Sequence, residues 1–268
     1  MLLKIFTAIF GRVPFISSRA RANAAGFSYR NESIPLQSIP EELHGVQLLF
    51  LTDPHIGGNI DSLAPEIHRN TKKLLEHSDP EKTLVLHGGD FICGQWTDLA
   101  KSERNAFDVA DILFDGLGKY RNFAVVGNHD DEDVTFPEMR EHLEKNIHAQ
   151  FMIDPTDMKQ VEINGKNIGI HGIHTLALRL HLMPHEERNA LMDAYIDKLN
   201  NSGNDMNIVL LHCPDGLEFL LARLKETGKK FQTPTLFFSG HTHGGMFDMF
   251  MLRTIGLIVC KTKFGRYK

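Results

Sequence analysis

Short apolar runs alternate with amphipathic stretches along the first half of the chain. The runs at 46–52, 83–86 and 122–126 have the length and composition of buried strands. The intervening and following stretches predict helices at 62–77, 102–114 and 136–146, and in the second of these the apolar residues recur with a helical period. This alternation is typical of a layered α/β fold.

The pattern changes in the second half, where a hairpin interrupts the alternation. Two strand-like runs at 159–163 and 167–171 flank Asn164-Gly165, a dipeptide typical of a two-residue hairpin turn. Pro184 suits the first turn of a helix. That helix is predicted at 184–199, and a strand, a helix and a strand follow at 207–212, 217–225 and 235–239. An antiparallel hairpin within strand–helix alternation predicts mixed sheets.

Composition and charge exclude several classes of protein. The 268 residues are 42% hydrophobic and 24% charged, which excludes disordered, collagenous and coiled-coil chains. No apolar run approaches the ~20 residues of a membrane-spanning helix. The three distant cysteines, Cys93, Cys213 and Cys260, exclude a disulfide framework and a thiolate zinc site. The net charge is −5, and residues 32–245 are more acidic than the chain as a whole because both ends are basic. This acidic centre argues against a nucleic-acid platform.

Side chains that bind metals follow five of the predicted strands. They lie in Asp53-Pro54-His55, Gly89-Asp90, Gly127-Asn128-His129-Asp130, His212 and Gly240-His241-Thr242-His243. Because ligands of open α/β sheets gather at the carboxyl ends of strands, we expect these segments to meet in one crevice. The donors are nitrogen and oxygen atoms, too many for one four-coordinate ion, so they suit two ions that share a carboxylate. His87, His171 and His174 also lie near strand ends, and we expect them to be buried or rim histidines rather than ligands.

In their order, these motifs resemble the signature of the calcineurin-like metallophosphoesterases, over about residues 27–245 and with no motif missing. The resemblance implies a four-layer αββα sandwich of two mixed β-sheets flanked by helices. It further implies that one metal ion is held by Asp53, His55, Asp90 and His243 and the other by Asp90, Asn128, His212 and His241. His129 would protonate the leaving group, and Asp130 would orient His129.

Two divalent ions about 3.5–4 Å apart can clamp a phosphoryl group and acidify a bridging water. The sequence therefore predicts a binuclear phosphoesterase that hydrolyses a phosphodiester or pyrophosphate bond by attack of a metal-bridging hydroxide. The mixed imidazole and carboxylate ligands favour manganese, with iron, zinc or cobalt as alternatives. A small soluble phosphodiester or nucleotide is the alternative substrate, and a phosphoprotein ranks third. A non-catalytic scaffold with the same fold is the alternative outside enzymes.

Both ends of the chain are basic and apolar. Residues 1–31 hold five basic residues and no acidic one, and residues 246–268 hold five basic residues and one acidic one. Apolar residues recur at helical spacing over residues 2–16, which predicts a basic amphipathic segment at 1–26, ahead of a metallophosphoesterase domain at 27–268. Such a segment favours peripheral contact with an anionic membrane surface. A transit peptide and a loose or core-packed terminus are the alternatives, whereas a secretory signal fits poorly.

The lead-in at 27–45 and the D-P-H and G-H-T-H-G-G sequences resemble one branch of the family most closely. That branch includes membrane-associated bacterial phosphodiesterases and UDP-diacylglucosamine pyrophosphohydrolases. Together with the basic ends, it favours a lipid-linked substrate and a cytoplasmic or peripheral membrane location. Relatives continue beyond the last motif with further strands, so the end at Lys268 predicts either a short natural C-terminus or a truncated one.

Overall fold

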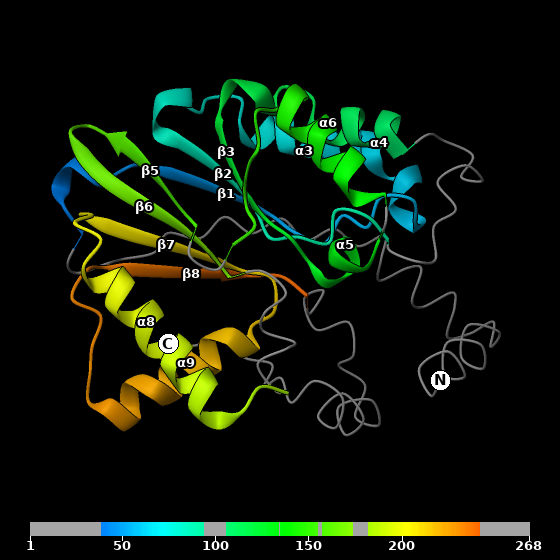
Figure 1. Ribbon diagram of the computed structural model, residues 1–268. Coiled ribbons are helices and arrows are strands. Elements are labelled where there is room, and N and C mark those ends of the chain that lie inside the picture. The colour runs from blue at the N-terminus through cyan, green and yellow to red at the C-terminus, as the bar shows by residue number, and fades with distance from the viewer. Residues whose placement is uncertain (1–38, 94–105, 134, 155–156, 174–181, 242–268) are drawn as a thin grey trace, which may run out of the picture.

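The computed structural model describes residues 39–93, 106–133, 135–154, 157–173 and 182–241, which form four layers (Figure 1). Helices α3, α4 and α6 cover the outer face of one sheet, a second sheet packs on its inner face, and α8 and α9 cover the second sheet's outer face. The predicted αββα sandwich is confirmed. The segment predicted at 1–26 lies outside the described residues.

The bounds of the elements agree closely with the sequence pattern. The strands are β1 Gln47–Leu51, β2 Thr83–His87, β3 Arg121–Val125, β4 Gln150–Met152, β5 Met158–Ile163, β6 Lys166–Ile173, β7 Met206–Leu211 and β8 Thr235–Ser239. The α-helices are α3 Ala64–Leu74, α4 Ala106–Phe114, α5 Asn128–Glu132, α6 Phe136–Asn146, α8 His185–Asn200 and α9 Asp215–Thr227. Short 3-10 helices occur at η1 Glu41–Leu43, η2 Asn59–Ser62, η3 Pro80–Lys82 and η4 Leu117–Lys119. The strand β4 and the helix α5 were not predicted.

The first sheet has the order β1-β2-β3-β4, and all its described pairs are parallel. Its second strand is buried on both faces, as parallel strands covered by two layers require. Leu84 and Leu86 face the second sheet, whereas Val85 faces the helices. The all-parallel pairing brings the carboxyl ends of β1, β2 and β3 to the same edge.

The second sheet has the order β5-β6-β7-β8 and is mixed. β5 and β6 form the predicted antiparallel hairpin, and Asn164 and Gly165 at its turn have φ values of 52° and 77°, as a type I′ turn requires. The pairs β6–β7 and β7–β8 are parallel. The carboxyl ends of β7 and β8 therefore also lie at one edge of their sheet.

Three apolar clusters hold the layers together. The central one lies between the sheets, and there the rings of Phe50 on β1 and Phe238 on β8 have centroids 5.3 Å apart. The other two lie between each sheet and its helices. Within the described ranges, no helix combines the length and the hydropathy needed to cross a lipid bilayer.

Each sheet contains one buried histidine–asparagine pair on its helix-covered side. His87 Nε2 lies 3.1 Å from Asn122 Oδ1, and His171 Nε2 lies 3.0 Å from Asn207 Oδ1. Both histidines are at most 1% exposed, so of the two alternatives they are buried, and His174 lies outside the described residues. Burial lowers the pKa of each histidine to about 4, although the bond to asparagine acts in the opposite direction. The folded protein therefore keeps both rings neutral well below the ordinary pKa of histidine.

The low pKa of His171 predicts a loss of stability in acid. Between about pH 6.5 and pH 4 the unfolded chain takes up a proton that folded His171 refuses, so the free energy of unfolding falls as the pH falls. We expect His171→Gln to reduce the slope of that free energy against pH by up to about 1 kcal/mol per pH unit, measured by urea unfolding. The exposed His77 supplies the control: His77→Gln should keep the wild-type slope. Equal slopes in the two variants would contradict this account.

Candidate metal centre

The predicted ligands lie on loops at the carboxyl ends of five strands. Asp53 and His55 follow β1 and Asp90 follows β2, while Asn128 and His129 begin α5 directly after β3. His212 follows β7 and His241 follows β8, so the second sheet supplies the remaining described candidates. Hydrogen bonds and ion pairs bring these residues together across the two sheets. The structure therefore brings the described candidates close together, and His243 lies outside the described residues.

The backbone of these loops adopts a left-handed conformation that residues other than glycine rarely adopt. Asp53, His55, Asp90 and His241 have φ values of 54°, 46°, 54° and 68°. Only two other described non-glycine residues have positive φ, so this conformation is concentrated at the candidate ligands. Such residues cost about 1–3 kcal/mol each and persist only where their surroundings enforce them.

Two glycines allow the loops to approach closely. A Cβ atom at Gly127 would collide with the backbone amide and the carboxylate of Asp90. A Cβ atom at Gly240 would collide with the hydroxyl of Thr52 and lie 2.6 Å from Asp53 Oδ2. The G-N-H-D and G-H-x-H motifs therefore need glycine because another loop occupies the space of the missing side chain.

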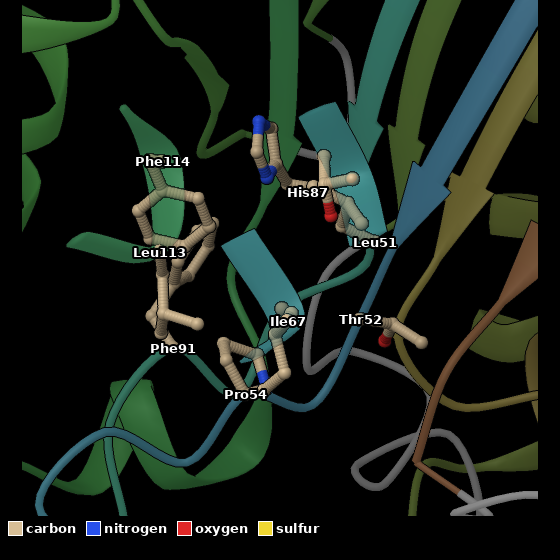
Figure 2. Close-up of a pocket in the computed structure, with 10 residues that line it drawn as sticks. Leu51, Thr52, Pro54, Ile67, His87, Phe91, Leu113 and Phe114 are labelled. Atoms are coloured by element: carbon tan, nitrogen blue, oxygen red, sulfur yellow. The ribbon is translucent and has the colours of Figure 1, made fainter. Parts of the chain in front are cut away.

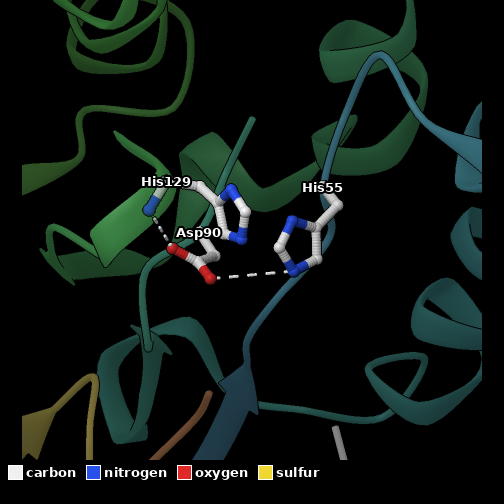
Figure 3. Close-up of side chains that lie close together, drawn as sticks. All are labelled: His55, Asp90 and His129. Carbon is white, nitrogen blue, oxygen red and sulfur yellow. Dashed lines mark hydrogen bonds and ion pairs between the residues drawn. The ribbon is translucent and has the colours of Figure 1, made fainter. Parts of the chain in front are cut away.

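The carboxylate of Asp90 lies at the centre of the site (Figure 3). Its side chain is 1% exposed, and its Oδ2 lies 3.2 Å from His212 Nε2 and 3.7 Å from His55 Nε2. Its Oδ1 accepts a 2.9 Å hydrogen bond from the backbone amide of His129. Burial raises the pKa of Asp90, but the hydrogen bond from His212 and the nearby imidazoles outweigh burial and lower that pKa to about 2. The carboxylate is therefore ionised at neutral pH.

The donor atoms form two groups that share Asp90. Ligand atoms of His55, Asp90 and His129 lie within 4.8 Å of one another, as do those of Asp90, His212 and His241. Each group combines imidazole nitrogens with a carboxylate oxygen, a donor set that suits a divalent transition-metal ion. A shared carboxylate also reduces the repulsion between two cations. The residues present therefore fit a pair of divalent ions.

Two further candidates lie next to these groups. Asn128 Oδ1 is 2.9 Å from His212 Nε2, so the amide oxygen points to the second group. Asp53 Oδ1 is 4.0 Å from His55 Nε2, on the side of the first group. The backbone amide of His241 donates to both carboxylate oxygens of Asp53 at 3.0 Å, which ties the first loop to the last.

His212 is oriented by the main chain. Its Nδ1 lies 2.8 Å from the carbonyl oxygen of Gly88, and because a carbonyl only accepts, Nδ1 carries the hydrogen. Nε2 therefore faces Asp90 and the candidate ligand atoms of Asn128 and His241. Burial lowers the pKa of His212, but the hydrogen bond and charge of Asp90 reverse this effect and raise that pKa to about 9. A cation that binds Nε2 must therefore displace a proton.

Asp130, which was expected to orient His129, bonds to the backbone of the neighbouring loops. The Asp130 carboxylate is buried and accepts hydrogen bonds from the backbone amides of Gly127 and Ile92, at 2.9 and 3.1 Å. Among the described residues it forms no hydrogen bond to the ring of His129. Consecutive side chains of a helix diverge by about 100°, so the His129 ring points elsewhere and packs edge-on against His55, with centroids 4.9 Å apart. Asp130 instead joins the loops after β2 and β3.

Burial raises the pKa of Asp130 to about 7, with a further contribution from the charge of Asp90.

One residue that contributes to the site lies outside the sequence motifs. The hydroxyl of Thr52 donates to Asp53 Oδ2 at 2.6 Å. Its only signal in the sequence is a polar residue at the end of an apolar run.

Comparisons with known proteins agree with this geometry. No curated protein shows a significant match to the sequence. A solved structure of a protein of unknown function from Aquifex aeolicus is 17% identical, with 74% of this chain and 91% of that chain covered and a TM-score of 0.36, a similarity too low to support an argument. Residues 46–245, which contain every described candidate ligand, match the calcineurin-like phosphoesterase family. The chain therefore belongs to the calcineurin-like phosphoesterase family.

Proposed function

We propose that this chain hydrolyses a phosphodiester or pyrophosphate bond with the help of two divalent metal ions. Membership of the family indicates metal-dependent hydrolysis of a phosphoester. The observation that carries the binuclear proposal is the Asp90 carboxylate, which lies between two groups of nitrogen and oxygen donors. His129, which belongs to the first group, is proposed as the proton donor rather than as a ligand.

The proposed ligands divide between the two ions. Asp53, His55, Asp90 and His243 would hold one ion, and Asp90, Asn128, His212 and His241 would hold the other. Bound divalent ions supply a Lewis acid for the phosphoryl oxygens and lower the pKa of a water. We propose manganese as the metal, with iron, zinc and cobalt as alternatives, because the donors are imidazoles and carboxylates rather than thiolates.

His129 is the proposed general acid. Its ring is partly exposed and lies against His55, while its backbone amide is held by Asp90. An imidazole in this position can donate a proton to the leaving oxygen of the substrate. Asp130 is the proposed positioning residue for His129, because its two backbone hydrogen bonds hold the loop that carries His129.

We propose a lipid-linked substrate and peripheral membrane contact. The support comes from the sequence, in which both ends of the chain combine basic and apolar residues while the rest is acidic. A small soluble phosphodiester is the alternative that a substrate comparison distinguishes.

The shared carboxylate gives the most direct test of the binuclear proposal. We expect Asp90→Asn to lower the hydrolysis of bis(p-nitrophenyl) phosphate by at least about 100-fold and to reduce the content of divalent ions below two per chain, because both ions lose a ligand. Steady-state kinetics and elemental analysis measure the two effects. Asp111→Asn, on the outer helix α4, is the matched control and should change neither. Wild-type turnover by Asp90→Asn would refute the proposal.

The role of His129 can be separated from that of the ligands by the choice of leaving group. An alkoxide needs a proton to leave, whereas p-nitrophenolate needs little help. We expect His129→Asn to retain two ions and to lose about 100-fold or more in kcat with an alkyl phosphodiester, but much less with the nitrophenyl ester. The surface variant His142→Asn controls for the loss of an imidazole. Equal losses with both esters would exclude His129 as the proton donor.

The substrate class can be tested with a panel of phosphoesters. We expect kcat/KM to be highest for a lipid-linked pyrophosphate or phosphodiester presented in anionic vesicles, and at least about tenfold lower for the soluble headgroup that contains the same bond. Phosphate monoesters should be poor substrates. A preference for the soluble compound would favour the alternative substrate class.

A further inference from the structure

We propose that Thr52 is a positioning residue that holds the carboxylate of Asp53 in the orientation in which one of its oxygens faces the ion bound with His55. The inference rests on the proposed binuclear function and adds to it a residue outside the ligand set. Thr52 directly follows β1, and its hydroxyl donates to Asp53 Oδ2 at 2.6 Å. This distance is in the range of the short, charge-assisted hydrogen bonds between a hydroxyl and a carboxylate.

The hydroxyl of Thr52 lies in a slot between two glycines on other loops. A Cβ atom at Gly88, after β2, would lie 2.5 Å from Thr52 Oγ1. A Cβ atom at Gly240, after β8, would overlap the same oxygen. Loops from both sheets therefore leave room for this hydroxyl, and any larger residue at either position would displace it.

The two oxygens of Asp53 have different surroundings. Oδ2 accepts from the Thr52 hydroxyl and from the backbone amide of His241, whereas Oδ1 accepts from the same amide and lies 4.0 Å from His55 Nε2. The side chain of Asp53 is 5% exposed, so bulk water contributes little to its orientation. Together with the His241 amide, the hydroxyl therefore restrains the rotation of the carboxylate and keeps Oδ1 on the side of His55.

The loop that carries Asp53 borders a cavity on its rear side. This cavity of about 60 Å³ lies between the first sheet and the helices α3 and α4 (Figure 2). Its wall includes Thr52, Pro54, His87 and Phe91, and in this view Thr52 lies apart from the aromatic side chains. Since apolar side chains do not fill this space, the hydrogen bonds from Thr52 and His241 contribute to the direction of the Asp53 carboxylate.

The chemical consequence is specific to one ion. Groups that orient a metal ligand commonly change metal affinity by about 10- to 100-fold. Asp53 belongs to the set proposed for the ion shared with His55, whereas Asn128, His212 and His241 belong to the other ion. Loss of the Thr52 hydroxyl should therefore weaken one of the two ions and leave the other nearly unchanged.

The test uses the full-length protein, stripped of metal and titrated with Co²⁺ while heat and visible absorption are recorded. We expect Thr52→Val, which keeps the shape and removes the donor, to weaken one of two binding steps by about 10- to 100-fold, with the other step within about threefold of wild type. Thr52→Ser, which restores the hydroxyl, should bring both steps within about threefold. Thr71→Val, at a buried threonine on α3 that lines the same cavity, is the matched control and should affect neither step.

The outcomes separate this inference from the function on which it rests. If Thr52→Val binds both ions as the wild type does, weakens both steps equally, or is not rescued by Thr52→Ser, the positioning role is wrong while the binuclear centre stands. If the wild type binds fewer than two Co²⁺ ions, the proposed function itself fails. Should Thr52→Val not fold, as judged by its unfolding midpoint, Thr52→Ala removes the same donor without adding a branched side chain, and the same criteria apply.

Discussion

The carboxylate of Asp90 is almost entirely removed from water, and the arrangement of the loops follows from the need to compensate its charge. An isolated buried carboxylate is so costly that it would take up a proton instead. Here Asp90, from the first sheet, is paired with His212 from the second sheet, whose other ring nitrogen returns to the carbonyl of Gly88 beside Asp90. The contact that prepares the metal centre therefore also joins the two sheets at their common edge.

The same edge concentrates unfavourable backbone conformations. Four candidate ligands have positive φ, and glycines at 127 and 240 bring neighbouring loops into contact. Hydrogen bonds between loops, such as those of Asp130 with two backbone amides, hold these conformations in place. The protein itself therefore orients the candidate ligands, which would lower the entropic cost of binding an ion there.

Sequence reasoning reached the strands, the hairpin and the candidate ligands because each has a local signal, whereas the four layers followed from the family resemblance. Long apolar runs such as those of β2 and β7, and the dipeptide Asn164-Gly165, can be read without knowledge of the rest of the chain. The strand β4 was not predicted because three residues are too few to show the alternation of a strand. The hydrogen-bond partners of Asp130 could not be predicted because one of them is the backbone amide of Ile92, 38 positions away. The role of Thr52 depends on empty space at Gly88 and Gly240, which no spacing reveals.

The outermost described strand of the second sheet carries the loop that completes the crevice. β8 is only half-buried. The hydrogen bond from the His241 amide to the Asp53 carboxylate joins residues that are 188 positions apart in the sequence. Fraying of this single strand would break that hydrogen bond and withdraw Phe238 from the central cluster, while the other strands of both sheets kept their pairs. On heating, activity would then be lost before the protein unfolds, so the temperature at which turnover stops would lie below the temperature at which helicity is lost.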